Sequence, residues 1–127
     1  MLVTGTFNIV HAGHVELLEY AYQFGRVIVG INDDEYQRAK YGHLAVKARD
    51  RAYVLRANRF VSDVVFFSES HPGDLIRLIR PAFYIKGPDY LDKEIPEMNA
   101  CIECDVQILY CPKNKIYNGS ELKYCLE

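Results

Sequence analysis

The stretch Gly5-Thr6-Phe7-Asn8-Ile9-Val10-His11-Ala12-Gly13-His14 decides the fold of this 127-residue chain, because it joins a strand to a helix. The run before it, Met1-Leu2-Val3-Thr4, is short and apolar, as in a buried strand, and Gly5 ends it. Apolar residues then recur at helical spacing over 14–24, and Gly25 stands at the expected C-terminal cap. We therefore expect a strand, a turn and the start of a helix.

The two histidines of this stretch are three residues apart, so they lie on one face of the first helical turn. Free N–H groups and the positive end of the helix dipole favour an anion at that place. His11 and His14 can donate hydrogen bonds to phosphate oxygens, and Gly13 lets a nucleotide lie close to the backbone. The pattern suits nucleotidyl transfer, in which a phosphate attacks the α-phosphorus of a nucleoside triphosphate. The alternative is a pair of surface histidines.

Strands and helices alternate along the rest of the chain. We expect further strands at 26–31, 64–67, 83–86 and 106–110, and helices at 35–40, 48–60, 72–80, 96–103 and from about 120. This predicts one α/β domain over 1–127, a Rossmann-like, doubly wound, five-stranded parallel sheet with helices on both faces. Ligands of such sheets bind beyond the carboxyl ends of the strands, so the histidine turn, Asn32-Asp33-Asp34 and Lys86-Gly87 should face one cleft.

The chain closely resembles the cytidylyltransferase-like nucleotidyltransferase family, the HxGH superfamily, over nearly its whole length. The family signature GxFDxxHxGH corresponds to residues 5–8 and 11–14. Within the family, the chain is similar to the glycerol-3-phosphate cytidylyltransferases and to the adenylyltransferase domain that makes ADP-activated heptose, and residues 75–81 and 85–90 look more like the heptose group. The resemblance implies transfer of CMP or AMP from CTP or ATP to glycerol 3-phosphate or a sugar phosphate. It also implies pyrophosphate release, Mg²⁺ bound with the triphosphate, no metal ligand from the protein, and a homodimer.

The resemblance also assigns roles to individual residues. The implied catalytic residues are His11, His14, Lys40 and Arg59. The implied nucleotide-binding residues are Gly5, Thr6, Phe7, Gly13, Lys86, Gly87, Asn118, Gly119 and Ser120. The implied substrate-binding residues are Asn8, Asp34 and Lys113. Structural alternatives stay open: Lys40 as a solvated surface lysine, Asp34 as a helix cap, and Arg59 as a cation favoured by a helix dipole. Arg51 also matches a family arginine, and we rank it below Arg59.

The chain departs from the family pattern at three places. Asn8 replaces the aspartate of GxFD, Ser62 replaces an aspartate expected near the cleft, and Asn118-Gly119-Ser120 replaces a Ser-Thr-Thr turn. We expect altered substrate preference rather than lost activity, because the histidines remain. The alternative is a non-catalytic nucleotide-binding or sensing module on the same fold. A fragment of an RNA-ligand synthetase is disfavoured, because the chain has no KMSKS-like loop and no basic surface.

Composition limits the partners and the compartment. A formal net charge of −2 gives no electrostatic case for nucleic acid or an anionic membrane. No run approaches the roughly 18 apolar residues of a membrane span, and no signal peptide is apparent, so we expect a cytoplasmic protein. The cysteines at 101, 104, 111 and 125 are expected to be reduced thiols, with tetrahedral zinc as the alternative. Tyr41, Tyr53 and Phe60 could form a dimer contact or pack in the core.

Overall fold

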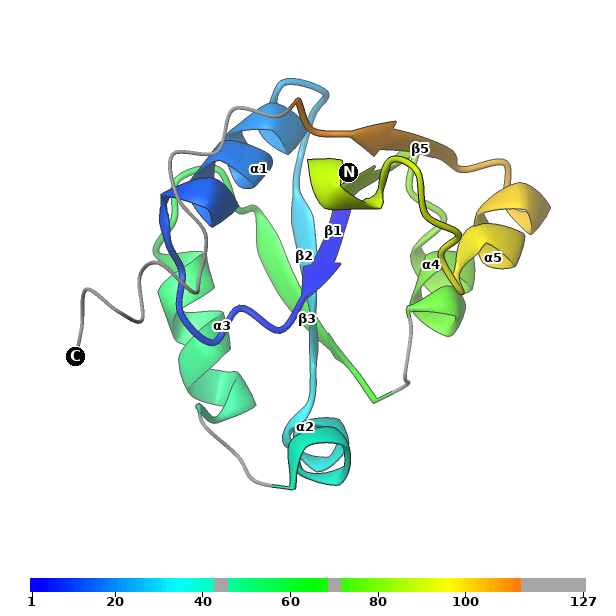
Figure 1. Cartoon of the computed structure of the whole chain (residues 1–127). Coiled ribbons are helices and arrows are strands. Elements are labelled where there is room, and N and C mark those ends of the chain that lie inside the picture. Colours follow the sequence, from blue (N-terminus) through cyan, green and yellow to red (C-terminus); the bar gives the residue numbers. More distant parts are fainter. Residues whose placement is uncertain (43–45, 69–71, 113–127) are drawn as a thin grey trace.

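In a computed structural model, whose described residues are 1–42, 46–68 and 72–112, the chain forms a five-stranded parallel sheet in the order β3-β2-β1-β4-β5 (Figure 1). The strands are β1 (Leu2–Gly5), β2 (Ile28–Asn32), β3 (Asp63–Phe67), β4 (Phe83–Lys86) and β5 (Gln107–Tyr110). Each pair of neighbours is parallel. The predicted α/β fold class is confirmed.

The strand order reverses at β1, the central strand. The chain adds β2 and β3 on one side of β1 and then crosses over to add β4 and β5 on the other. Leu2 accordingly pairs with both Ile28 of β2 and Tyr84 of β4. The connections after β1 and β4 leave in different directions, which opens a crevice at the carboxyl ends of these two strands.

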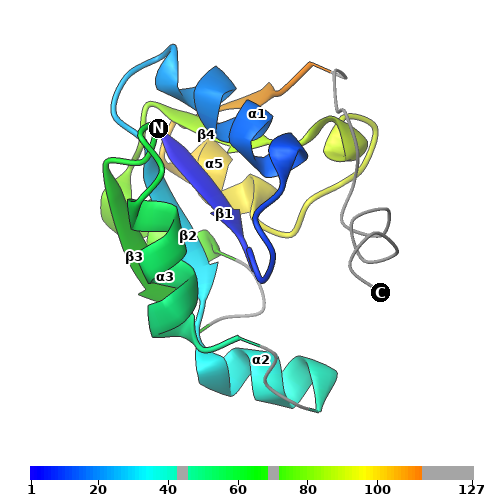
Figure 2. The same cartoon turned by 90° about the vertical axis from the view of Figure 1, so that its left-hand side faces the viewer.

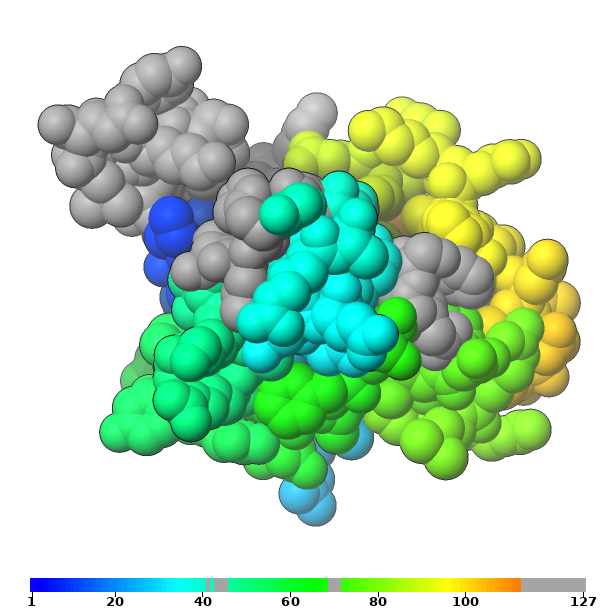
Figure 3. Space-filling model, turned by 90° about the horizontal axis from the view of Figure 1, so that it is seen from below, coloured from blue at the N-terminus to red at the C-terminus, as the bar shows by residue number. Residues whose placement is uncertain are grey.

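Helices cover both faces of the sheet. Figure 2 shows α1 (Ala12–Tyr22) and α3 (Ala48–Arg56) in front of the sheet and α5 (Met98–Glu103) behind it. Helix α4 (Gly73–Ile79) packs beside α5. Helix α2 (Asp34–Tyr41) follows β2 directly and lies beyond the carboxyl ends of the strands, and a short 3₁₀ helix, η1 (Pro88–Tyr90), follows β4. Figure 3 views the side of the molecule on which α2, in cyan, lies.

Alternation along β1 divides the core into two layers, because successive strand side chains point to opposite faces. Val3 packs with Leu18 of α1 and Leu55 of α3, whereas Leu2 packs with Ile76 of α4. Gly30 of β2 makes room for the second layer. A Cβ at this position would lie 2.7 Å from Leu75 Cδ2 and 3.2 Å from Thr4 Cγ2, so a larger residue here would force the Leu75 side chain of α4 to shift.

The element boundaries differ little from those predicted, with one difference that matters for the site. The helix expected over 48–60 ends at Arg56, because the chain turns there: Asn58 N–H donates to the Leu55 carbonyl, and Asn58 Oδ1 accepts from Phe60 N–H. The helix expected from about residue 120 lies outside the described residues. Among the described residues, no helix is long and apolar enough to cross a membrane.

Candidate active site

Helix α1 begins with two histidines that cap it reciprocally. Gly13 N–H donates to His11 Nδ1 at 3.1 Å, and His11 N–H donates to His14 Nδ1 at 3.3 Å. The two rings stack with their centroids 3.9 Å apart. Because both Nδ1 atoms accept, each neutral imidazole must carry its hydrogen on Nε2. The cap therefore selects the tautomer that presents an N–H donor at the far side of each ring.

The turn before the histidines is held in a strained conformation by packing. Phe7 has a φ of 53°, which is uncommon for a residue with a side chain, and its ring is buried against His14 with centroids 4.9 Å apart. A Cβ at Gly5 would lie 2.9 Å from Phe7 Cε2. Gly5 and Phe7 therefore fit together only because position 5 has no side chain.

A buried arginine fixes the same turn from below. Arg51 is 1% exposed, and its guanidinium donates to the carbonyls of Val46 and Thr6 and to Asn32 Oδ1 at 2.9, 3.0 and 3.2 Å. Its Nη2 lies 3.6 Å from Asp34 Oδ1. Burial lowers the pKa of Arg51, and Asp34 opposes that effect. The arginine ranked second in the sequence analysis is thus the one that supports the histidine turn.

Arg59 and Ser62 lie at the opposite end of the sheet, which corrects two predictions. Arg59 is exposed, and its guanidinium stands 4.9 Å over the Phe60 ring. Ser62 Oγ accepts from the N–H of Val27, the residue before β2 begins. Both therefore lie at the amino ends of β2 and β3. Arg59 does not join the histidines, and the acid missing at position 62 does not face the cleft.

Two acidic residues after β2 act as helix caps. Asp33 Oδ1 accepts from Tyr36 N–H at 2.8 Å and caps α2. Asp34 Oδ1 accepts from Ala48 N–H at 2.7 Å, at the start of α3, and faces Arg51. These contacts agree with the alternative role of Asp34 as a helix cap. They do not place its carboxylate in the cavities described below.

Asn8 is oriented by a buried partner. Gln37, which is 1% exposed, donates from Nε2 to Asn8 Oδ1 at 2.9 Å. Gln37 therefore uses one lone pair of the Asn8 oxygen, which leaves the second lone pair and the amide N–H₂ to meet a ligand. Where the family has a carboxylate, this chain presents a neutral side chain fixed by α2.

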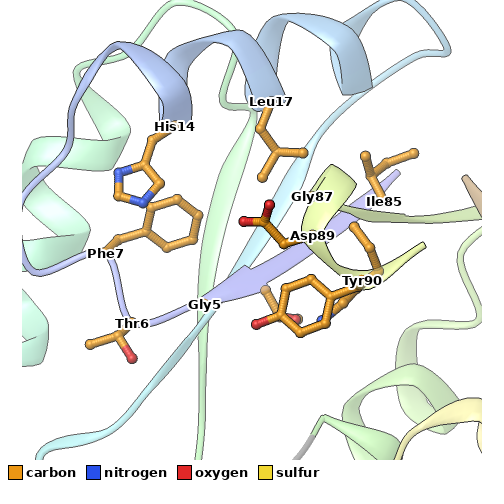
Figure 4. Close-up of a pocket in the computed structure, with 11 residues that line it drawn as sticks. Gly5, Thr6, Phe7, His14, Leu17, Ile85, Gly87, Asp89 and Tyr90 are labelled. Atoms are coloured by element: carbon orange, nitrogen blue, oxygen red, sulfur yellow. The ribbon is translucent and has the colours of Figure 1, made fainter. Parts of the chain in front are cut away.

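A first cavity of about 250 Å³ opens at the carboxyl ends of β1 and β4, where the strand order reverses. Figure 4 shows the His14 and Phe7 rings on one side and Tyr90 on the other, with the Asp89 carboxylate between them. Six residues predicted for the site line it together: Gly5, Thr6, Phe7, His14, Lys86 and Gly87. The remaining lining residues are Thr4, Leu17, Ile85, Asp89 and Tyr90.

A second cavity of about 350 Å³ adjoins the first, and its charged lining residues are three lysines and two glutamates, Glu94 and Glu97. Lys40, which was predicted for the site, lines it together with Lys86 and Lys93. The two cavities share four lining residues: Thr4, Gly5, Lys86 and Tyr90. These four residues, which we call the junction, form the boundary between the cavities.

A buried hydrogen-bond chain runs beneath the junction. Glu97 Oε1 accepts from Tyr84 OH at 2.8 Å and from Lys86 Nζ at 3.3 Å, and Tyr84 OH lies 2.7 Å from Thr4 Oγ1. Burial, and then the charge of Glu97, raise the pKa of Tyr84, so its hydroxyl stays protonated. The single hydrogen of Tyr84 goes to the carboxylate. Thr4 must therefore donate to Tyr84, which leaves the lone pairs of the Thr4 oxygen for a ligand.

Several lining residues were missed from the sequence: Thr4, Asp89, Tyr90, Lys93 and Glu97. Asp89 and Tyr90 follow Lys86-Gly87 directly after a strand at the reversal point, and that position was a signal for them. Glu97 gave no signal, because an acid near a helix start is typical of a cap. Lys113, Asn118, Gly119 and Ser120 lie outside the described residues.

The cysteines carry no metal site in the part of the chain that the structure describes. Cys101 and Cys104 are free thiols, and among the described residues no group of three or more His, Cys, Asp or Glu is placed to hold a metal ion. The zinc alternative required Cys125 as its fourth ligand, and that residue lies outside the described ranges.

The sequence model of the cytidylyltransferase-like family matches residues 2–121. The chain belongs to this family. Among curated proteins, this cytidylyltransferase-like chain is 39% identical to the bifunctional protein HldE of Nitratiruptor sp. over 98 residues, and 41% identical to that of Campylobacter curvus over 98 residues. Each match covers 75% of this chain and 21% of the relative, so the matched part spans about a fifth of the length of these relatives.

Solved structures share the fold of this cytidylyltransferase-like chain. The lipopolysaccharide core biosynthesis protein from Thermoplasma volcanium superposes with a TM-score of 0.72 at 19% identity, covering 90% of this chain and 96% of that one. A protein of unknown function from Archaeoglobus fulgidus gives a TM-score of 0.59 at 17% identity, covering 91% and 100%. At these identities the likeness concerns the fold alone.

Proposed function

We propose that the chain transfers CMP or AMP from CTP or ATP to a phosphorylated small molecule of the glycerol 3-phosphate or sugar phosphate type, and releases pyrophosphate. The observation that carries this proposal is the junction: one cavity bordered by a histidine-capped helix start meets a second cavity lined by Lys40, Lys86 and Lys93. The family supports nucleotidyl transfer as the class of reaction. Separate nucleotide and acceptor sites with a common boundary are what that reaction needs.

The residues of the first cavity would hold the nucleotide. Its α-phosphate would lie near the start of α1, where His14 presents Nε2–H and the helix dipole favours negative charge. The acceptor phosphate oxygen attacks the α-phosphorus, the bond to the β-phosphate oxygen breaks, and pyrophosphate leaves. The protein supplies oriented donors and positive charge, and no side chain needs to form a covalent bond.

Mg²⁺ fits this arrangement as a partner of the triphosphate. Mg²⁺ in such sites is typically held by phosphate oxygens and waters with one or two carboxylates, and Asp89 places a carboxylate in the first cavity. The bound ion would neutralise charge on the phosphates. Asn8 is a weaker ligand than an aspartate, because its side-chain oxygen is neutral and already accepts one hydrogen bond from Gln37.

The second cavity favours an acceptor that has both a phosphate and a hydroxyl group. Lys40 and Lys93 offer charge to an anion, and the Thr4 oxygen offers lone pairs to a hydroxyl donor. The likeness of residues 75–81 and 85–90 to the heptose group supports a sugar phosphate within this class.

A second candidate function is nucleotide binding without turnover. The observation that favours it is Asn8, whose amide replaces a carboxylate beside the histidine turn and is locked by Gln37. Such a module would bind a nucleoside triphosphate and release no pyrophosphate with any acceptor.

The test begins with calorimetric titration by CTP and by ATP, each with Mg²⁺. Pyrophosphate release is then measured over a panel of glycerol 3-phosphate and sugar phosphates, with His14→Ala as the inactive comparison. Release that depends on one acceptor and on His14 supports the enzyme. Tight nucleotide binding without release across the panel supports the binding module, and absence of nucleotide binding contradicts both.

We also propose a homodimer that works in the cytoplasm, where nucleoside triphosphates are available. Tyr53 on α3 is 78% exposed, which suits a contact between two copies. Phe60 instead packs against Tyr22, and Tyr41 ends α2. Light scattering at several concentrations, with Tyr53→Ser for comparison, should give a dimer mass that the variant reduces. A monomer mass in the unaltered protein would contradict the dimer.

A further inference from the structure

The Lys86 ammonium lies at the junction of the two cavities and is held there by one buried carboxylate. Its Nζ is 3.3 Å from Glu97 Oε1 and 4.0 Å from the centroid of the Tyr90 ring. The side chains of Lys86 and Glu97 are only 12% and 3% exposed. Fixing a lysine side chain in one position costs conformational entropy. The contacts with Glu97 and Tyr90 offset that cost and keep the ammonium in place.

Glu97 is itself fixed and cannot follow the lysine. It precedes α5, and the same Oε1 that faces Lys86 accepts from the hydroxyl of Tyr84, a fully buried residue of β4. Tyr84 is in turn bonded to Thr4 of β1. The carboxylate is therefore a stationary counter-charge anchored to the two strands that border the crevice.

We propose that Glu97 is a positioning residue for the transfer: its carboxylate keeps the Lys86 ammonium at the junction, in competition with phosphates that would draw it into one cavity. This inference rests on the proposed function, in which the transferred phosphorus passes from the first cavity to an acceptor in the second. A donor that serves that step must stay between the cavities. Interactions that strengthen in the transition state accelerate a reaction, whereas those equally strong in the bound substrate do not.

The proposal predicts that phosphate affinity and turnover change in opposite directions when the carboxylate is removed. Glu97→Gln leaves Lys86 without its counter-charge, so a bound anion becomes the best partner for the ammonium. Binding of tripolyphosphate should become about threefold tighter, because the Glu97 carboxylate no longer competes with the phosphate for the Lys86 ammonium. Turnover should fall about tenfold, because the ammonium then follows the ground-state phosphate. A variant that was only destabilised would not bind an anion more tightly.

The experiment is a double-mutant cycle with Glu97→Gln, Lys86→Met and the double variant. Calorimetry measures tripolyphosphate affinity at fixed salt, and pyrophosphate release measures turnover with whichever acceptor the unaltered protein uses. Lys86→Met should bind tripolyphosphate about tenfold more weakly, as expected for loss of a charge-assisted contact. In that background Glu97→Gln should have no further effect. Glu103→Gln is the matched control, since it breaks an exposed ion pair with Arg77 at the other end of α5 and should change neither quantity.

Each outcome decides the proposal. Weaker tripolyphosphate binding in Glu97→Gln, or tightening that persists in the Lys86→Met background, overturns it. If the tripolyphosphate affinities change as predicted but no acceptor gives pyrophosphate release, the interaction of Glu97 with Lys86 is supported and the proposed function is rejected instead. If Glu97→Gln does not fold, Tyr84→Phe decides, in the unaltered protein and in the Lys86→Met background, because it removes one bond of the carboxylate and also the bond to Thr4. Slower turnover that is absent in the Lys86→Met background supports the proposal, and slower turnover that persists there, or unchanged turnover, overturns it.

Discussion

The Arg51 guanidinium donates a hydrogen bond of 3.0 Å to the carbonyl of Thr6, a residue 45 positions earlier in the chain. This contact ties the turn before the histidines to the first half of α3. It also explains how a turn with a strained residue, Phe7, keeps one conformation: the surrounding structure determines it from two sides.

Arg51→Ala should therefore destabilise the protein and disturb the site. We expect a loss of about 3–5 kcal/mol in the free energy of unfolding, because Asp34 and the Thr6 carbonyl lose a buried partner. Urea denaturation measures this. Arg49→Ala is the matched control: its side chain is 80% exposed and 3.8 Å from Asp50, so the change should stay within about 0.5 kcal/mol. Equal effects of the two variants would contradict the supporting role of Arg51.

His14→Ala should reduce turnover about 10²-fold, as expected for loss of an oriented donor. The same change removes a helix-capping bond, so a fall of about 1 kcal/mol in stability should accompany it. Asp33→Ala separates the two effects, because it removes the cap of α2 at a similar cost without touching the first cavity. If both variants slowed turnover equally, His14 would act only as a cap.

Gly5→Ala should weaken nucleotide binding by about tenfold and cost about 1–3 kcal/mol in stability, because the new Cβ forces the Phe7 ring to move. The comparison is Gly87→Ala, where a Cβ would meet nothing within 4 Å, so stability should be retained. Thermal unfolding and nucleotide titration of both variants provide the measurement. A fully stable Gly5→Ala would show that the turn adapts more easily than its packing indicates.

Asn8→Asp should make nucleotide binding more dependent on Mg²⁺. A carboxylate can still accept from Gln37, and it adds negative charge near the triphosphate, so ATP should bind more weakly without Mg²⁺ and more tightly with it. Calorimetry with and without the ion tests this, and Asn99→Asp, an exposed change on α5, serves as the control. The same response in both variants would remove Asn8 from the nucleotide site.

Cys101 should resist alkylation in the folded protein. Burial, and then the charge of Glu97, raise the pKa of its thiol to about 11, so below that pH the unreactive thiol predominates. At pH 8 its thiolate fraction should be about 100-fold smaller than in the unfolded chain, and it should rise with pH toward 11. Mass spectrometry after iodoacetamide treatment compares Cys101 with the half-buried Cys104 in native and denatured protein. Equal labelling of both in the native state would contradict this.

The parts of the fold that local pattern determines were predictable. The strand, turn and helix around the histidines follow from apolar spacing and glycine placement within a short segment, and the sheet class follows from alternation. The strand order depends on contacts between distant segments, so the sequence predicted a doubly wound sheet with a point of reversal but not the order β3-β2-β1-β4-β5.

The two arginines show where sequence reasoning stopped short. Residues 48, 51, 52 and 55 are the inward positions of α3, spaced as one helix face. Arg51 therefore stood at a core position, and a buried charge there indicates a specific partner. Arg59 lies beyond the end of α3, whose C-cap is Ala57. The turn that follows, in which Asn58 Oδ1 accepts from Phe60 N–H, is not revealed by helical periodicity alone. The Lys86–Glu97 pair depends on the path of the chain between them, and composition gives no information on that path.

Under the proposed function, the shared boundary of the two cavities means that each ligand would contact residues that also contact the other. Thr4, Gly5, Lys86 and Tyr90 would touch whatever occupies either side. A single molecule that joins a nucleotide to an acceptor-like group would therefore occupy both cavities and pass these four shared residues. Joining the halves makes the second contact intramolecular, which can raise affinity by about 10²–10⁴ over either half alone. The most effective inhibitor of this protein should accordingly resemble its linked product rather than either substrate.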